Sequence, residues 1–442
     1  MALFTVSPIC TPEAGNPGVR SPLVTPPSSA PQAGQAAPLV VRTIPVDQAD
    51  LPLLDLLPQQ DPVSWLRRGE GLVGWGVAAR LETSGPTRFS DAVKWWSETV
   101  ARADVEDHVG EPGTGLVCFG AFAFADEPGD SVLVIPQVVV GRRGDRTWLT
   151  TVSVDAPDLA PTDRPSPPVG LVFSDGARNG EEWMSVVADA VDRIAAGDLE
   201  KVVLARDLIA TTDEPLDVRW PLRRLAESYE MCWTFHVDGL FGATPEMLVR
   251  RERGLVTSRV LAGTIRRTGD DERDLALAAT LARSSKDLEE HEYAVRSVAD
   301  ALEPHCSSMS VPEAPFVLHL PNVMHLATDV NGVVHDLATS LQLAESLHPS
   351  AAVGGTPTPV ATRLISEIEG MARDRYAGPV GWMDGDGDGE WGIALRSAMV
   401  TEDGVRLFAG CGIVASSDPE AELAESQAKF VPVRDALGAD TP

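Results

Sequence analysis

Apolar residues recur at helical spacing in several segments of the chain. Between residues 181 and 196 they stand three or four apart, at Trp183, Val186, Val187, Ala190, Val191 and Ile194. This period predicts an amphipathic helix, with Gly197 as its C-terminal cap. Similar patterns predict helices over 218–229, 271–303, 336–346, 357–374 and 419–437.

Shorter apolar runs, bounded by glycine, proline and polar residues, predict strands. They lie at 116–120, 131–136, 201–206, 231–238, 247–251, 255–260, 315–320, 322–329, 379–383, 391–400 and 405–409. Hairpins of such strands combined with long helices favour a layered α+β fold over a repeated βαβ array.

Two segments are too rich in proline and small residues to form a core. Residues 1–38 are predicted to be a disordered Pro-rich tail. A second stretch, 156–168, is predicted to be a linker or a long surface loop. We therefore expect one folded unit over 39–442, with an N-terminal portion at 39–175 and a core at 180–438.

The composition is that of a soluble globular protein, with 43% hydrophobic and 23% charged residues. The net charge of −29 argues against nucleic acid or an anionic membrane as a partner, because both require basic patches. An anionic substrate would need local lysine, arginine or a metal ion. The five cysteines are scattered and odd in number, which predicts reduced thiols and a cytoplasmic location. Neither a membrane span nor a secretory signal is expected.

Two glycine-rich segments resemble binding loops only in part. Residues 384–390 begin like a calcium loop, but the twelfth position, which should be glutamate, is Leu395. A hairpin turn is the better interpretation. Residues 410–415 partly resemble a dinucleotide fingerprint but open no βαβ unit. We expect a backbone turn there, whose amides approach a carboxylate.

Several charged or titratable residues do not indicate a functional site when each is considered alone. Glu422, Glu425 and Lys429 share one face of the last predicted helix, and such faces are usually solvated. Asp287 and Glu290 lie on a flank of the 271–303 helix. His325 stands in an apolar strand, where a core histidine is the default interpretation. Lys201 is a lone lysine at the start of a strand-like run.

Taken in order, these segments resemble the chorismate-utilising enzymes, the family of isochorismate, salicylate, anthranilate and aminodeoxychorismate synthases. The resemblance is strong over about 180–438 and weak over 40–180. The matching stretches are KVVLAR (201–206), GATPEML (242–248), VLAGTIRR (260–267), SSKDLEEH (284–291), VMHLATDV (323–330), LHPSAAVGGTP (347–357), YAGPVGWMDGDGDGEW (376–391), IALRSAMV (393–400) and RLFAGCGIVASSDPEAELAESQAKF (406–430).

The resemblance implies a reaction class. Relatives that use ammonia carry glutamine where Lys201 stands, so lysine implies water as the nucleophile. Aminodeoxychorismate synthases carry a nucleophilic lysine where this chain has Ala262, which argues against covalent catalysis. The implied activity is isochorismate synthase, a Mg²⁺-dependent isomerase, and the alternative is salicylate synthase. Menaquinone and siderophore biosynthesis both stay open as pathways.

The same resemblance implies roles for individual residues. Lys201 would be the general base that activates water, which requires an uncharged amine, and Glu246 the general acid. Glu290 and Glu425 would bind Mg²⁺, with Asp287 and Glu422 holding metal-bound water. The implied substrate-binding residues are Gly263, Thr264, His325, Tyr376, Arg396, Gly410, Gly412 and Lys429. Arg396 and Tyr376 would take the enolpyruvyl carboxylate, and Lys429 and the Thr264 amide the ring carboxylate.

The fold and the partners are implied in the same way. The family fold has two large antiparallel sheets packed together, with helices around them and the site in a cleft. The expected ligand is chorismate. A glutaminase subunit is not expected, because water replaces ammonia, and the chain is expected to be a monomer.

Overall fold

The computed structural model describes residues 38–47, 51–319 and 323–438, except for the side chains of Lys286 and Glu290. By its internal contacts, 38–442 forms one compact unit. The predicted disordered tail lies, apart from residue 38, outside the described residues. No helix in the described ranges is both long and apolar enough to cross a membrane.

Eight α-helices and two short 3₁₀ helices occur in the described residues. The α-helices are α1 (Arg88–Val100), α2 (Gly180–Ala195), α3 (Arg219–Ser228), α4 (Asp271–Leu281), α5 (Ser285–Leu302), α6 (Ser340–Leu347), α7 (Thr358–Ile368) and α8 (Pro419–Leu437). The 3₁₀ helices are η1 (Leu53–Leu56) and η2 (Glu303–His305). The start of α2 shows why its sequence is helical: Asn179 and Glu182 form a reciprocal capping box.

The strands form two sheets. In sheet A the order is β10 (Val172–Asp175), β11 (Lys201–Thr211), β23 (Gly404–Ile413), β22 (Ser397–Thr401), β13 (Leu240–Thr244), β12 (Trp233–Val237), β2 (Val63–Arg67), β3 (Glu70–Trp75), β8 (Val138–Arg143), β9 (Arg146–Val152), β1 (Val40–Pro45) and β5 (Asp104–Asp107), with β19 (Gly355–Thr356) beside β11. In sheet B it is β16 (Cys306–Ser310), β18 (Val323–Val334), β15 (Leu255–Arg266), β14 (Met247–Glu252), β21 (Gly389–Ile393), β20 (Pro379–Asp384), β6 (Val117–Ala121), β7 (Ser131–Ile135) and β4 (Ala79–Thr83), with β17 (Phe316–His319) beside β18.

The two sheets share a hydrophobic core. Trp65 and Phe235 of sheet A belong to the same buried cluster as Phe119 and Trp382 of sheet B. Burying each such aromatic side chain contributes roughly 1.5–3 kcal/mol. The central pairs, such as β11 with β23 and β15 with β18, are antiparallel. The predicted α+β fold with two large antiparallel sheets is therefore confirmed.

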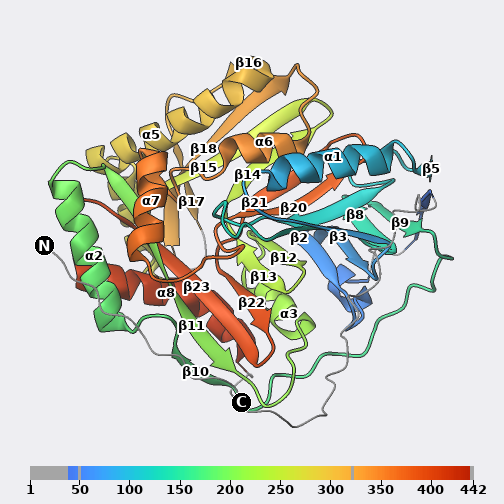
Figure 1. Ribbon diagram of the computed structural model, residues 1–442, viewed down its shortest axis with the longest axis horizontal. Coiled ribbons are helices and arrows are strands. Elements are labelled where there is room, and N and C mark those ends of the chain that lie inside the picture. Colours follow the sequence, from blue (N-terminus) through green and yellow to red (C-terminus); the bar gives the residue numbers. More distant parts are fainter. Residues whose placement is uncertain (1–37, 48–50, 320–322, 439–442) are drawn as a thin grey trace, which may run out of the picture. The chain divides into compact units, whose positions relative to one another are not determined.

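Helices α2, α5, α7 and α8 lie beside β11, β23, β15 and β18 (Figure 1). In sheet A, α2 and α8 pack on β23 and on each other, and α7 packs on β11. In sheet B, α5 packs along β15 and β18, and α6 packs on β14 and β21. The strands that carry most of the candidate residues are therefore the ones backed by helices.

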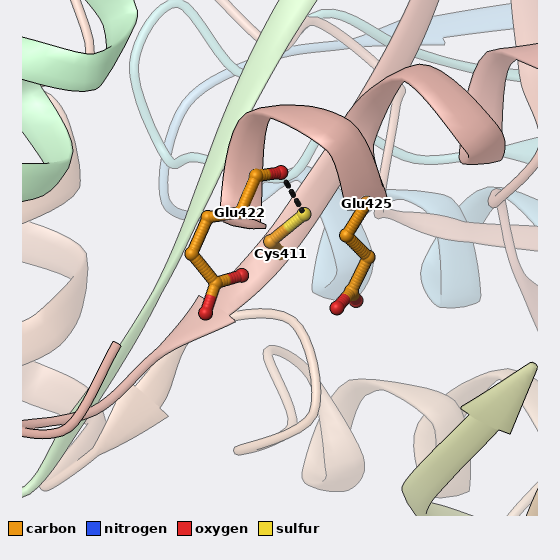
Figure 2. A group of neighbouring side chains, drawn as sticks. All are labelled: Cys411, Glu422 and Glu425. Carbon is orange, nitrogen blue, oxygen red and sulfur yellow. Dashed lines mark hydrogen bonds between the residues drawn. The ribbon is translucent and has the colours of Figure 1, made fainter. Parts of the chain in front are cut away.

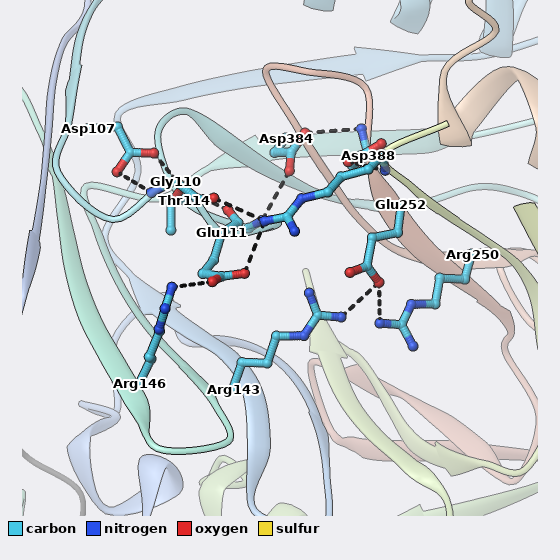
Figure 3. A network of polar contacts seen from close by, with 12 residues as sticks. Asp107, Gly110, Glu111, Thr114, Arg143, Arg146, Arg250, Glu252, Asp384 and Asp388 are labelled. Carbon is cyan, nitrogen blue, oxygen red and sulfur yellow. Dashed lines mark hydrogen bonds and ion pairs between the residues drawn. The ribbon is translucent and has the colours of Figure 1, made fainter. Parts of the chain in front are cut away.

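An ionic network joins β8 of sheet A to β14 of sheet B (Figure 3). Arg143 of β8 in sheet A pairs with Glu252 of β14 in sheet B at 2.8 Å. Arg250 pairs with the same carboxylate, and Arg251 with Asp388 of the hairpin between β20 and β21. The half-exposed pairs each contribute on the order of 1 kcal/mol or less, so the shared apolar core dominates the packing.

The chain passes between the sheets at two adjacent points. Strand β13 of sheet A leads through Pro245 and Glu246 into β14 of sheet B, and β21 of sheet B leads through 394–396 into β22 of sheet A. The Ile393 amide donates to the Glu246 carbonyl at 3.1 Å, and the Ala243 amide to the Arg396 carbonyl at 3.2 Å. These two crossovers are thus hydrogen-bonded to each other.

Two segments that were each predicted as one continuous element are divided in the structure, so these predictions were wrong. The helix over 271–303 is two helices, because the chain turns after α4 and Ser284 caps α5 by accepting the Asp287 amide at 3.3 Å. The strand over 391–400 is also two, β21 and β22, in different sheets. The break lies at Arg396, whose φ of 49° is incompatible with a continuous strand.

Two other helices are shorter in the structure than predicted. The helix predicted over 336–346 begins only after Thr339, which forms a capping box with Gln342. The helix predicted over 357–374 ends at Ile368, just before Gly370. Residues 156–168 contain neither helix nor strand and lie in the connection between β9 and β10. The 384–390 segment is the predicted hairpin turn, between β20 and β21.

Candidate active site

One cavity of about 230 Å³ gathers residues from both sheets and from α5 and α8. Of the residues singled out from the sequence it is lined by Lys201, Glu246, Gly263, Thr264, Asp287, His325, Tyr376, Arg396, Gly410, Gly412, Glu425 and Lys429. Positions spread over more than half of the chain therefore meet at one site, beside the two crossovers.

Lys201 enters the cavity from the first residue of β11. The neighbouring strand β23 places Gly412 opposite Val203, two residues further along β11. A Cβ atom on Gly412 would come within 3.0 Å of Cε of Lys201, so the glycine leaves the space that the lysine side chain occupies. The predicted backbone turn at 410–412 is wrong, because these residues continue β23, and their ladder partners are in β11.

Glu246 is buried at the crossover from β13 to β14. Its amide donates to Oγ1 of Thr244 at 3.2 Å, and Thr244 in turn donates to the Ile393 carbonyl at 2.6 Å. Burial raises the pKa of the Glu246 carboxyl to about 7, against the opposing influence of Arg396, Lys201 and Lys429. The carboxyl is thus divided between its neutral and charged forms near neutral pH, as a proton donor requires.

Thr264 and His325 face each other across β15 and β18. The register of this pair shifts between Ala262 and Thr264, so that Gly263, with φ +75°, forms a bulge. Oγ1 of Thr264 lies 2.9 Å from Nδ1 of His325. Burial, and then Arg396 and Lys429, lower the pKa of His325 to about 3, so the imidazole is neutral. Its Nε2 is buried and has no hydrogen-bond partner among the described residues.

Arg396 and Tyr376 lie on the sheet A side of the cavity. No described residue forms an ion pair or side-chain hydrogen bond with the Arg396 guanidinium. Tyr376 is buried, and its ring stacks on Phe408 at 5.0 Å between centroids. Burial also raises the pKa of Tyr376, so the phenol keeps its proton. A neutral hydroxyl donor and a guanidinium fork suit a carboxylate ligand.

Lys429 connects α8 to β23. Its Nζ donates to the Gly410 carbonyl at 2.8 Å and pairs with Glu425 at 2.7 Å, one turn earlier on α8. Burial opposes ionisation of Glu425, but Lys429 and Arg396 outweigh it and lower the pKa of this carboxyl. Glu425 is therefore a carboxylate at neutral pH and a candidate oxygen ligand for a cation.

Oxygen donors lie close together near the start of α8. Ligand atoms of Cys411, Glu422 and Glu425 lie within 4.8 Å of one another, and Figure 2 shows both glutamates on the same side of the helix. The Cys411 thiol donates to the Glu422 carbonyl at 3.4 Å. Burial raises the pKa of this thiol to about 12, which keeps it protonated and a poor ligand.

The donor set fits a hard cation in part. Glu422 does not line the main cavity and accepts from Ser417 at 2.7 Å, whereas Asp287 lines it from α5 together with Glu425. The Glu290 side chain lies outside the described residues, so its predicted role as a ligand stays a prediction. Carboxylates from α5 and α8 that meet at one cavity suit Mg²⁺, which takes few protein oxygens and keeps water.

Among the described residues that line the cavity, cationic side chains outnumber carboxylates. Lys201, Arg373, Arg396 and Lys429 face Glu246, Asp287 and Glu425. This local balance contrasts with the net charge of −29 for the whole chain. The cavity therefore supplies the local lysine and arginine residues that an anionic ligand was expected to need.

Sequence reasoning missed Arg373, which also lines the cavity. Arg373 is buried, pairs with Glu369 at 2.6 Å and donates to the carbonyls of Val353 and Val203 at 2.9 and 2.7 Å. It thereby holds the loop before β19 against β11. The sequence signal for this ion pair was the spacing of four residues between Glu369 and Arg373. Such pairs are common on exposed helix faces, so the spacing did not indicate a buried residue.

Comparison with known proteins identifies the family of the chain. The model of a family described as chorismate binding enzymes matches residues 32–163 and 160–438. Isochorismate synthase MenF of Bacillus subtilis is 29% identical over 403 residues, covering 84% of this chain and 86% of that protein. The salicylate biosynthesis isochorismate synthase of Pseudomonas aeruginosa is 34% identical, covering 85% and 84% respectively.

Solved structures show the same architecture. MenF of Escherichia coli, described as a menaquinone-specific isochorismate synthase, superposes with a TM-score of 0.76 at 25% identity, covering 91% of this chain and 95% of that one. DhbC of Bacillus anthracis, described as a putative 2,3-dihydroxybenzoate-specific isochorismate synthase, gives 0.73 at 32%, covering 87% and 98%.

Proposed function

The chain belongs to the family of chorismate-binding enzymes, and we propose that it is an isochorismate synthase that moves the ring hydroxyl of chorismate from C4 to C2. One observation carries the proposal within the family. A lysine, Lys201, lines the same cavity as a buried carboxyl, Glu246, whose pKa is raised to about 7. A base and an acid are what the addition of water and the loss of hydroxide require.

The two residues divide the proton transfers. Nζ of Lys201, when uncharged, takes a proton from water as the oxygen attacks C2. The neutral carboxyl of Glu246 gives its proton to the hydroxyl that leaves C4. One water is consumed and one is released, so the reaction is an isomerisation. Burial of Glu246 supports its part, because it favours the protonated form.

The remaining cavity residues bind and orient the two carboxylates of chorismate. We assign the enolpyruvyl carboxylate to Arg396 and Tyr376, since the Arg396 guanidinium has no other partner among the described residues. We assign the ring carboxylate to Lys429 and the bulge at Gly263 and Thr264. A bulge leaves a backbone amide outside the strand ladder, where it can donate to a ligand.

We also propose that the enzyme depends on Mg²⁺. Glu425 and Glu290 would hold the ion, with Asp287 and Glu422 binding its water molecules. The ion would neutralise charge between these acids and the ring carboxylate. Without a cation, Glu425 relies on Lys429 alone for an ion pair among the described residues.

Separating the products of a purified reaction tests the function. Incubation with chorismate and Mg²⁺ should give isochorismate, with neither pyruvate nor anthranilate, and added ammonium should change nothing. Lys201→Gln should lower turnover on the order of a hundredfold or more, because a general base is lost. Full water-dependent turnover by this variant would contradict the assignment of the base.

Salicylate and pyruvate at neutral pH would instead identify a salicylate synthase, the alternative activity. The named relatives divide among menaquinone, 2,3-dihydroxybenzoate and salicylate formation. The formation of isochorismate is the step that they share, and it is the step proposed for this chain. Water as nucleophile makes an ammonia-supplying subunit unnecessary.

A further inference from the structure

A second, much smaller cavity adjoins the candidate active site. It has a volume of about 20 Å³, and its walls come from β14, β15, α5, the segment 350–352 and Ile393. Glu246 and Ala352 line both this cavity and the main one. A cavity of this size has room for one water molecule, provided that two to four polar groups surround it.

Two polar groups at this cavity have no hydrogen-bond partner among the described residues. Oγ of Ser350 is buried and unpaired. The carboxyl of Glu246, which lines this cavity and the main one, has no hydrogen bond or ion pair with a described residue. The other polar side chains that line this cavity either have hydrogen-bond or ion-pair partners or are exposed to solvent. Oγ of Ser258 donates to the Leu248 carbonyl at 2.6 Å, and Arg259 is paired with Asp329 at 2.7 Å. Leaving a buried polar group unpaired is costly, so the Ser350 hydroxyl requires a partner inside the small cavity.

The backbone of Ser350 is held in a tight turn. The Ser350 carbonyl accepts the amides of Val353 and Gly354 at 3.1 and 2.9 Å, which forms a tight turn before β19. Arg373 fixes the same turn through the Val353 carbonyl. The backbone position of Ser350 beside the small cavity is therefore set by the fold.

We propose that Ser350 is a positioning residue of the reaction, acting through one water molecule that bridges its Oγ and the carboxyl of Glu246 inside the small cavity. The catalytic part of this inference rests on the proposed function. The neutral carboxyl donates its O–H to the water, and the water donates to Oγ of Ser350. The hydroxyl of Ser258 offers a further acceptor. In the resting enzyme the water thus holds the acid group neutral and in one orientation, and the single O–H turns from the water to the departing hydroxyl when the proton is transferred.

The charged groups around the Glu246 carboxyl determine how a bound water changes its ionisation. Lys201 of β11, Arg396 and Lys429 of α8 lie on the side of the main cavity, with Asp287 and Glu425, and Arg259 of β15 lies at the small cavity. The three cations facing the main cavity favour the charged form of Glu246. A water that accepts the carboxyl proton favours the neutral form, which is the form that reacts.

High-resolution crystal structures of the wild type and of Ser350→Ala test the water without reference to activity. We expect density for one water within hydrogen-bond distance of Oγ of Ser350 and of the Glu246 carboxyl in the wild type. In Ser350→Ala the water should be lost or displaced. An empty cavity in the wild type, or a Ser350 hydroxyl bonded to protein, would overturn the inference.

Kinetics test the positioning role. Ser350→Ala should lower kcat on the order of three- to tenfold, with little change in KM, because one supporting hydrogen bond is lost. The alkaline limb of its kcat profile should move to lower pH by roughly half a unit, since the neutral carboxyl loses its acceptor. Ser350→Thr, which keeps the hydroxyl, should restore both. An unchanged profile in Ser350→Ala contradicts the role.

Ser346→Ala is the matched control. This serine lies on α6, is exposed, and bonds to His305 and to the Gln342 carbonyl at 2.9 and 3.1 Å, away from the cavity. Its kcat and pH profile should equal those of the wild type, and equal melting temperatures for both alanine variants would exclude a folding defect. A wild type that makes no isochorismate would refute the proposed function, and the crystallographic density would still decide the bridging water.

Discussion

Gly412 lies against the side chain of Lys201, and a Cβ atom there would stand 3.0 Å from Cε and 3.5 Å from Nζ. Gly412→Ala should therefore push the amine from its place without changing the chemical groups of the site. We expect kcat to fall by up to roughly a hundredfold, because small displacements of a reacting group are costly. Steady-state kinetics of the purified variant measures this.

Gly385→Ala provides the control for this variant. Gly385 lies in the exposed turn between β20 and β21, where an added Cβ would meet nothing closer than 3.8 Å. Its kinetics should match those of the wild type. Equal activity in the two glycine variants would mean that Lys201 has another position from which it can work.

The pH dependence of activity should follow the ionisation of Glu246. The acid must be protonated to donate, and its pKa is about 7 in the free enzyme. kcat/KM should therefore decline as pH rises through about 7, giving an alkaline limb. In Glu246→Gln the limb should disappear together with most of the turnover. A rate that keeps rising well above neutral pH would assign the acid to another group.

The same ionisation predicts a pH-dependent gain in stability for Glu246→Gln. The folded pKa is about 7, above the ordinary value of 4.5, so the native protein holds more protons than the unfolded chain between these values. Wild-type stability is therefore lost as pH rises through this window. Above it, the variant should be more stable by on the order of 3 kcal/mol, and below it the difference should vanish.

Urea unfolding of the ligand-free proteins at acidic and at alkaline pH measures this difference. Glu402→Gln, at an exposed turn between β22 and β23, should show no such trend. A variant that is less stable than the wild type at alkaline pH would mean that the Glu246 carboxylate has a stabilising partner in solution.

Removal of the metal should abolish activity and lower thermal stability. EDTA should stop isochorismate formation, and Mg²⁺ added without chorismate should raise the melting temperature, because a ligand bound only by the native state stabilises it. Glu425→Gln should lose both responses. Glu420→Gln, an exposed residue in the first turn of the same helix, should keep them. A wild type that turns over fully in EDTA would contradict the metal assignment.

The parts of the fold that depend on local pattern were predictable from the sequence. The helix α2 and the strand that begins at Lys201 follow from apolar spacing, and the hairpin at 384–390 from its glycines. The gathering of Glu246, His325 and Lys429 at one cavity was expected only from the resemblance to a family. No periodicity along the chain indicates which distant elements become neighbours.

The errors arose where tertiary contacts override local pattern. The apolar run at 391–400 continues in sequence but changes sheet at Arg396, because each half pairs with a different partner strand. The glycines at 410 and 412 suggested a turn, yet in β23 they provide space for Tyr376 and Lys201. Ser350 could not be recognised, since its meaning depends on a cavity that exists only in the folded chain.

The paired crossovers at Glu246 and Arg396 have a consequence for variants far from the cavity. Both residues stand where the backbone leaves one sheet and enters the other, so any sliding of the sheets moves them together. We expect Trp382→Ala, which truncates an aromatic side chain of the shared core, to lower kcat, because this core helps to fix the two sheets relative to each other. Substitutions in the amino-terminal strands, which do not contact a ligand, can therefore change kcat.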